Sequence, residues 1–192
     1  MCFSFEVSLG TFLFSWSVSL YLLNKKSLNK SQTQNIYFLM IYSSIQAIDA
    51  ILWYINMKKN NINLFLSVFV IPTLLLLQVI YNLYIINNIT NPIIYLCIIY
   101  VYLDYIIGSD YTVKSCNSFN SPKWGNVDIS MITIIIFFIL VTYGRIGFEG
   151  EKLAFLIILS ISLLISIYIG GNISSVWCSL ANVLGLYYLF KY

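Results

Sequence analysis

Residues 64–86 read LFLSVFVIPTLLLLQVIYNLYII, a run of 23 residues without a charged side chain. The hydrocarbon core of a bilayer is about 30 Å thick, and a helix of roughly 20 mostly apolar residues crosses it. A membrane-spanning strand would alternate apolar and polar side chains, and this run does not. The stretch therefore predicts a transmembrane helix. Pro72 lies inside it, where we expect a kink that frees a backbone carbonyl near Val68.

The composition of the whole chain agrees with this prediction. Of its 192 residues, 60% are hydrophobic and only 9% are charged, whereas a soluble domain carries about 25% charged residues. A soluble domain, a disordered chain and a fibrous repeat are therefore excluded. Histidine is absent, which excludes His-ligated zinc or haem, and we predict no metal site and no cofactor. The net charge of +3 does not indicate a nucleic-acid partner.

Six further apolar runs complete the predicted fold class, an all-α integral membrane bundle of about seven transmembrane helices. The predicted spans are 5–23, 36–56, 64–86, 93–107, 129–143, 153–169 and 175–190. Residues 1–192 then form a single transmembrane domain with the lipid bilayer as its partner. An odd number of spans puts the N- and C-termini on opposite sides of the membrane. The pattern does not indicate an oligomeric state.

The basic residues suggest an orientation. We call the side of the membrane that holds residue 1 side A and the opposite side side B. Side A receives Lys58, Lys59, Lys114 and Lys123, and side B receives Lys25, Lys26, Lys30, Arg145, Lys152 and Lys191. Because cytoplasmic loops carry the excess of Lys and Arg, side B is predicted to be cytoplasmic and the N-terminus outside or luminal.

Three acidic residues, Glu6, Asp49 and Asp104, fall within the predicted spans, and no Lys or Arg accompanies them there. A carboxylate near the centre of a membrane helix costs about 2.5–3.5 kcal/mol on insertion scales. Glu6 lies at the mouth of the first span and Asp104 near the end of the fourth, so both also fit a simple interfacial position. Asp49 lies near the middle of the second span, where the bilayer offers no such position.

Gln46, Asp49 and Trp53 follow one another at i, i+3 and i+7, so they share one helix face that must meet protein or water. We predict a polar vestibule open to side A, in which these three residues, with Glu6 and Asp104, bind a small molecule or an ion. The alternative is that the polar face only makes structural hydrogen bonds between helices.

Three of the four cysteines, Cys2, Cys116 and Cys178, are predicted on side A, while Cys97 lies inside a span and is expected to pack there. If side A is oxidising, one disulfide is plausible. Cys2 and Cys178 are the favoured pair because both stand at the start of a span, although connectivity stays open. If Met1 is removed, Cys2 can instead become an N-terminal nucleophile.

Four short motifs together resemble a family of uncharacterised multi-pass membrane proteins encoded by giant nucleocytoplasmic DNA viruses, with bacterial relatives that begin Met-Cys-Phe-Ser. The motifs are Met1-Cys2-Phe3-Ser4, Gln46-x-x-Asp49-x-x-x-Trp53, Ser121-Pro122-x-Trp124-Gly125 and Val176-Trp177-Cys178. The resemblance implies a viral or host intracellular membrane, and it favours Cys2 and Cys178 as a matched pair. It implies no activity.

Three functional hypotheses follow. The first is a small-molecule or proton-linked transporter or channel with Asp49 as its central group. The second is a structural or scaffolding protein of a viral or virus-modified membrane, in which Asp49 only links helices. The third is an intramembrane enzyme that uses Cys2 or Asp49, although the sequence leans away from an enzyme.

Overall fold

The computed structural model describes residues 4–25, 27–85, 91–114, 122–143, 150–170 and 181–192. Its elements are α1 Phe5–Leu23, α2 Lys30–Tyr54, α3 Asn61–Phe65, η1 Leu66–Val70, α4 Ile71–Ile85, α5 Pro92–Ile106, β1 Val113–Lys114, β2 Pro122–Lys123, η2 Trp124–Asn126, α6 Met131–Thr142, α7 Gly150–Gly170 and α9 Ala181–Lys191. The elements α3, η1 and α4 join into one helix, Asn61–Ile85. Within the described ranges, each of the seven predicted spans therefore overlaps one helical segment, of which α6 with 12 residues and α9 with 11 residues are the shortest.

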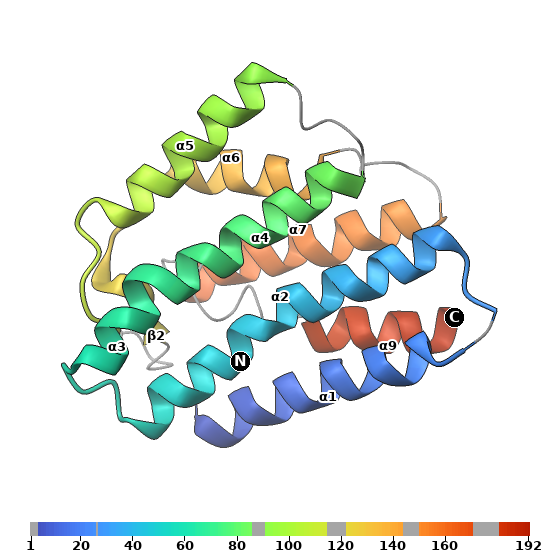
Figure 1. The fold of residues 1–192 in the computed structure, drawn as a ribbon, viewed down its shortest axis with the longest axis horizontal. Coiled ribbons are helices and arrows are strands. Elements are labelled where there is room, and N and C mark those ends of the chain that lie inside the picture. Colours follow the sequence, from blue (N-terminus) through green and yellow to red (C-terminus); the bar gives the residue numbers. More distant parts are fainter. Residues whose placement is uncertain (1–3, 26, 86–90, 115–121, 144–149, 171–180) are drawn as a thin grey trace.

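Helix α2 lies at the centre of the bundle (Figure 1). Helices α1 and α9 pack against it on one side, and α4 packs against it on the other side and carries α5 and α6. In Figure 1, α1 begins at the left-hand end of the bundle and α9 ends at the right-hand end. Among the described helices, α1, α2 and Asn61–Ile85 are long and apolar enough to cross a membrane.

Helix α2 begins six residues before the predicted apolar span because polar side chains extend it. Asn29 and Gln32 form a capping box, in which the side chain of each accepts a hydrogen bond of 2.9 Å from the backbone N–H of the other. Two backbone donors that a helix start leaves unpaired are satisfied in this way. The apolar run alone therefore places the start of this helix too late in the sequence.

The predicted kink at Pro72 takes the form of a π-helical turn, η1, directly before α4. In the π register each N–H bonds five residues back, so residue 72 would pair with the carbonyl of Ser67, but proline has no N–H. The hydroxyl of Tyr105 on α5 donates to that carbonyl instead, at 3.2 Å. The carbonyl that accepts the hydrogen bond from α5 is therefore that of Ser67, one residue before Val68, where the sequence predicts the freed carbonyl.

Candidate functional site

Asp49 lies beneath the α5–α6 connection, by which we mean the described residues 107–114 and 122–130. The side chain of Asp49 is fully buried, and Trp124 of the connection is 4% exposed. Trp124 Nε1 donates a hydrogen bond of 2.8 Å to Asp49 Oδ1. Asp49 stands five residues before the end of α2, about 7.5 Å along the helix axis. An indole ring therefore lies beside Asp49, where the sequence predicted a polar vestibule.

Backbone geometry around Gly125 orients Trp124. The short strands β1 and β2 pair antiparallel directly before Trp124. Gly125 then has a φ of +61°, and a Cβ atom there would lie 3.0 Å from the Cβ atom of Ser109. Its N–H donates to Thr112 Oγ1 at 3.1 Å. Glycine is required after Trp124, because other residues would meet both a strained backbone and a close contact.

A buried group of three polar side chains, Asn63, Ser67 and Thr112, attaches the connection to the helix Asn61–Ile85. All three are fully buried. Asn63 Oδ1 accepts the N–H of Thr112 at 2.9 Å, and Asn63 Nδ2 donates to the Thr112 carbonyl at 3.0 Å. The hydroxyls of Ser67 and Thr112 lie 2.7 Å apart. These paired polar groups fix the position of the strand hairpin that precedes Trp124.

The side chain of Asp104 on α5 accepts hydrogen bonds from the start of α6, as Asp49 does from Trp124. Its Oδ2 accepts a hydrogen bond of 2.5 Å from Thr133 Oγ1 and one of 3.4 Å from the backbone N–H of Ser130. Ser130 is the N-cap of α6, so this half-buried carboxylate lies where the helix N–H groups favour negative charge. Asp49, predicted near the middle of its span, and Asp104, predicted near the end of its span, therefore both accept bonds from the connection or the helix that follows it.

The other three predicted site residues, Gln46, Trp53 and Glu6, differ in how deeply they are buried. Gln46 is fully buried on α2. Trp53 is half-buried, and the Nζ atom of Lys114 lies 5.1 Å from the centroid of its ring. Glu6 is exposed in the first turn of α1. Asp49 and Trp53 thus both contact the connection, whereas Glu6 is exposed on α1.

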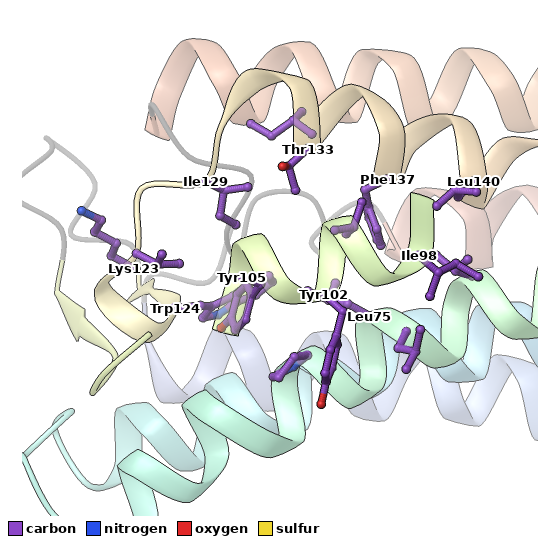
Figure 2. Close-up of a pocket in the computed structure, with 16 residues that line it drawn as sticks. Leu75, Ile98, Tyr102, Tyr105, Lys123, Trp124, Ile129, Thr133, Phe137 and Leu140 are labelled. Atoms are coloured by element: carbon purple, nitrogen blue, oxygen red, sulfur yellow. The ribbon is translucent and has the colours of Figure 1, made fainter. Parts of the chain in front are cut away.

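A cavity of about 60 Å³ lies between α4, α5, α6 and the connection. Figure 2 shows Lys123 and Trp124 at one end of it and Ile98 and Leu140 at the other. Its walls are mostly aliphatic and aromatic, and the polar side chains Thr133 and Lys123 also line it. Asp49 does not line this cavity. This cavity, which Trp124 lines and Asp49 does not, is therefore mostly apolar.

Two polar contacts between α1 and α9 were not predicted from the sequence. Ser15 Oγ donates to Asn182 Oδ1, and Asn182 Nδ2 donates to Thr11 Oγ1, both at 3.2 Å. The available signal was the spacing of Ser8, Thr11, Ser15 and Ser19, which puts four small polar side chains on one face of the first helix. All four are buried.

The residues Gln78 and Asn82, one turn apart on α4, are both fully buried but differ in their surroundings. Asn82 Nδ2 donates to the carbonyls of Leu140 and Tyr143, each at 2.9 Å. Neither amide atom of Gln78 has a hydrogen-bond partner within the part of the chain that the structure describes. A buried polar group without a partner costs about 1–3 kcal/mol.

The cysteine predictions lie mostly outside the described residues. Cys2, Cys116 and Cys178 are not described, so the disulfide between Cys2 and Cys178 stays a prediction. Cys97 is half-buried on α5 with a free thiol. Among the residues that were placed, no group of three or more Cys, Asp or Glu side chains could hold a metal ion.

Comparisons with protein-family models, with curated proteins and with solved structures find no match to this chain. Its function is therefore inferred from its own residues.

Proposed function

We propose that this chain is a multi-pass integral membrane protein whose seven helical segments cross a bilayer. Large apolar side chains on outward faces support this, among them Leu96 and Ile132, which are 67% and 62% exposed. Exposed aromatic residues near helix ends, such as Tyr54 and Tyr84, are typical of membrane–water interfaces. We further propose that side B is cytoplasmic, that the N-terminus is outside or luminal, and that the membrane is viral or host intracellular.

Within that membrane, the geometry best supports a structural or scaffolding role. The observation that supports it is the hydrogen bond between Trp124 and the fully buried Asp49. A carboxylate that exchanges an ion or a proton needs a path to water, and Asp49 lies against an indole ring instead. Asp104 is engaged in the same manner by Thr133. Both acids then serve to attach the α5–α6 connection across the side-A end of the bundle.

Transport through Asp49 remains a second proposal, and one observation favours it. An asparagine would accept the same hydrogen bond from Trp124 without the cost of burying an ionisable group. The presence of a carboxylate is therefore consistent with a site that binds a proton or a cation. In this alternative Trp124 covers an occluded site, and the connection moves to admit the ion. An enzymatic role that uses Cys2 rests on a residue outside the described ranges.

Two variants of Asp49 separate these roles by stability. Asp49→Asn keeps an oxygen acceptor for the indole, whereas Asp49→Leu removes it. A structural role predicts that Asp49→Asn unfolds at a temperature close to that of the wild type in detergent. Asp49→Leu should unfold at a lower temperature, because it leaves the Trp124 N–H buried without an acceptor. Tryptophan fluorescence during heating measures both.

Proton flux then tests the transport alternative directly. The wild type and Asp49→Asn are reconstituted into liposomes that contain a pH-sensitive dye, and a pH gradient is applied across the membrane. The structural proposal predicts flux at the level of empty liposomes for both proteins. Wild-type flux above that level, abolished in an Asp49→Asn variant that remains folded, would overturn the structural role.

A further inference from the structure

We propose that the cavity between α4, α5 and α6 binds one acyl chain of a bilayer phospholipid. This inference rests on the proposed membrane location of the chain, and it assigns a ligand to a space that neither Asp49 nor Asp104 lines.

The walls of the cavity fit a hydrocarbon chain. Leu75 and Val79 of α4, Val101 of α5 and Phe137 and Leu140 of α6 face into it. An apolar cavity of this kind stays dry and takes up apolar guests in preference to water. Its volume of about 60 Å³ exceeds the roughly 10–15 Å³ that one water molecule requires. The cavity is therefore large enough to hold several chain carbons.

The lining of the cavity also changes from polar to apolar along its length, as a lipid does from headgroup to chain end. Lys123 and Trp124 line the end near the α5–α6 connection, Thr133 lies farther along, and Leu140 lines the opposite end (Figure 2). From Thr133 to Leu140 the cavity follows seven residues of α6, about 10 Å along the helix axis. The polar lining thus lies at the end of the cavity near the start of α6, and the apolar lining extends along α6 away from it, which matches a lipid with its headgroup at the end near the connection.

Access to the cavity is lateral, from the surrounding lipid. Leu76 and Tyr102, which line it from α4 and α5, are only half-buried. On the remaining surface of α5, Leu96, Ile99 and Leu103 are exposed. Within α5, Pro92–Ile106, Tyr105 is the one buried residue. A phospholipid is the molecule that meets such an opening at the highest local concentration, so its chain is the occupant that we assign.

The test uses the full chain in phosphatidylcholine liposomes that contain a phosphatidylcholine with a photoactivatable group near the end of one chain. After illumination, mass spectrometry locates the labelled residues on α6. Phe137 and Leu140 report the cavity, and Ile139, which is 49% exposed, reports the outer lipid-facing surface. The inference predicts labelling of both surfaces in the wild type.

Val101→Phe fills the cavity, and Leu103→Phe is its matched control, because Leu103 is 47% exposed on the same helix. In Val101→Phe, labelling of Phe137 and Leu140 should fall about tenfold, the loss expected when roughly two buried methylene groups are excluded. Labelling of Ile139 should not change, and the control should match the wild type. Ile98→Phe fills the deeper end and replaces Val101→Phe if that variant does not fold.

Three results would overturn the inference in distinguishable ways. If Ile139 is labelled in the wild type but Phe137 and Leu140 are not, the chain is in the bilayer and the cavity is empty of lipid. If cavity labelling is equal in the wild type and in a folded cavity-filling variant, the lipid reaches α6 by another route. If none of the three residues is labelled, the proposed membrane location fails as well.

Discussion

Trp124 donates its indole N–H to Asp49 across 75 positions of the sequence, and both side chains are buried. The bond joins the connection between α5 and α6 to the second helix of the bundle. Hydrogen bonds to charged or ionisable partners are stronger than neutral ones, and a buried carboxylate that loses its donor is costly. We therefore expect this pair to dominate the stability of the side-A end.

Trp124→Phe tests that expectation, because it keeps an aromatic ring while removing the N–H donor together with part of the buried indole. The free energy of unfolding should fall by about 1–3 kcal/mol, since Asp49 loses the bond from the indole. Chemical denaturation in detergent measures it. Trp53→Phe is the control, because its half-buried ring meets Lys114 through the ring face, which Phe retains. Equal stability of the two variants would show that the bond contributes nothing.

A second prediction concerns Tyr105 and Pro72, which meet at the carbonyl of Ser67. Tyr105→Phe should lower the free energy of unfolding by about 0.5–1.5 kcal/mol, because the buried carbonyl loses its donor. In a Pro72→Ala background the backbone N–H of residue 72 can donate to the Ser67 carbonyl. Tyr105→Phe should therefore lower the free energy of unfolding by less in that background. A double-mutant cycle measures the coupling between the two positions. Strictly additive effects would contradict the proposed exchange of donors.

The third prediction contrasts Gln78 with Asn82. Gln78→Leu should raise the free energy of unfolding by about 1–3 kcal/mol, because it removes a buried amide whose atoms lack hydrogen-bond partners in the described part of the chain. Asn82→Leu should lower it, because the carbonyls of Leu140 and Tyr143 lose their donor. Thermal unfolding in detergent compares the two. If Gln78→Leu also destabilises the protein, the Gln78 amide has a role in the fold.

Asn182 provides a fourth prediction about the attachment of α9. Asn182→Ala removes its hydrogen bonds with Thr11 and Ser15, and the free energy of unfolding should fall by about 1–3 kcal/mol for the two bonds together. Amide hydrogen exchange in α9 should also become faster. Asn24→Ala is the matched control, since Asn24 makes a single exposed bond to the Leu20 carbonyl. Unchanged exchange in α9 would mean that apolar packing alone holds this helix.

The helices could be predicted because each one is a local property of the sequence. The first span, 5–23, agrees with α1, and the fourth differs from α5 by one residue at each end. The start of α2 was missed because the Asn29–Gln32 capping box lies outside the apolar run. Here the polar cap, and not the hydropathy, decides where the helix begins.

The site was less predictable because its contacts join distant segments. The face of Gln46, Asp49 and Trp53 followed from helical spacing, but nothing local indicated that Trp124 would turn inward and lie against Asp49. That placement depends on the hairpin of β1 and β2 and on the positive φ of Gly125. Similarly, a proline inside a helix predicted a freed backbone carbonyl near residue 68. The donor to that carbonyl, the Tyr105 hydroxyl, depends on how α5 packs and is not a local property of the sequence.

The long separation between Asp49 and Trp124 has a consequence for biosynthesis. A ribosome that adds 5–20 residues per second completes Trp124 roughly 4–15 s after Asp49. In the proposed membrane location, the second helix enters the bilayer during that interval without its indole donor. Until then the Asp49 side chain needs another hydrogen-bond partner or contact with water. The order of translation thus separates the synthesis of the second helix from the formation of this bond, while α6, α7 and α9 are made later still.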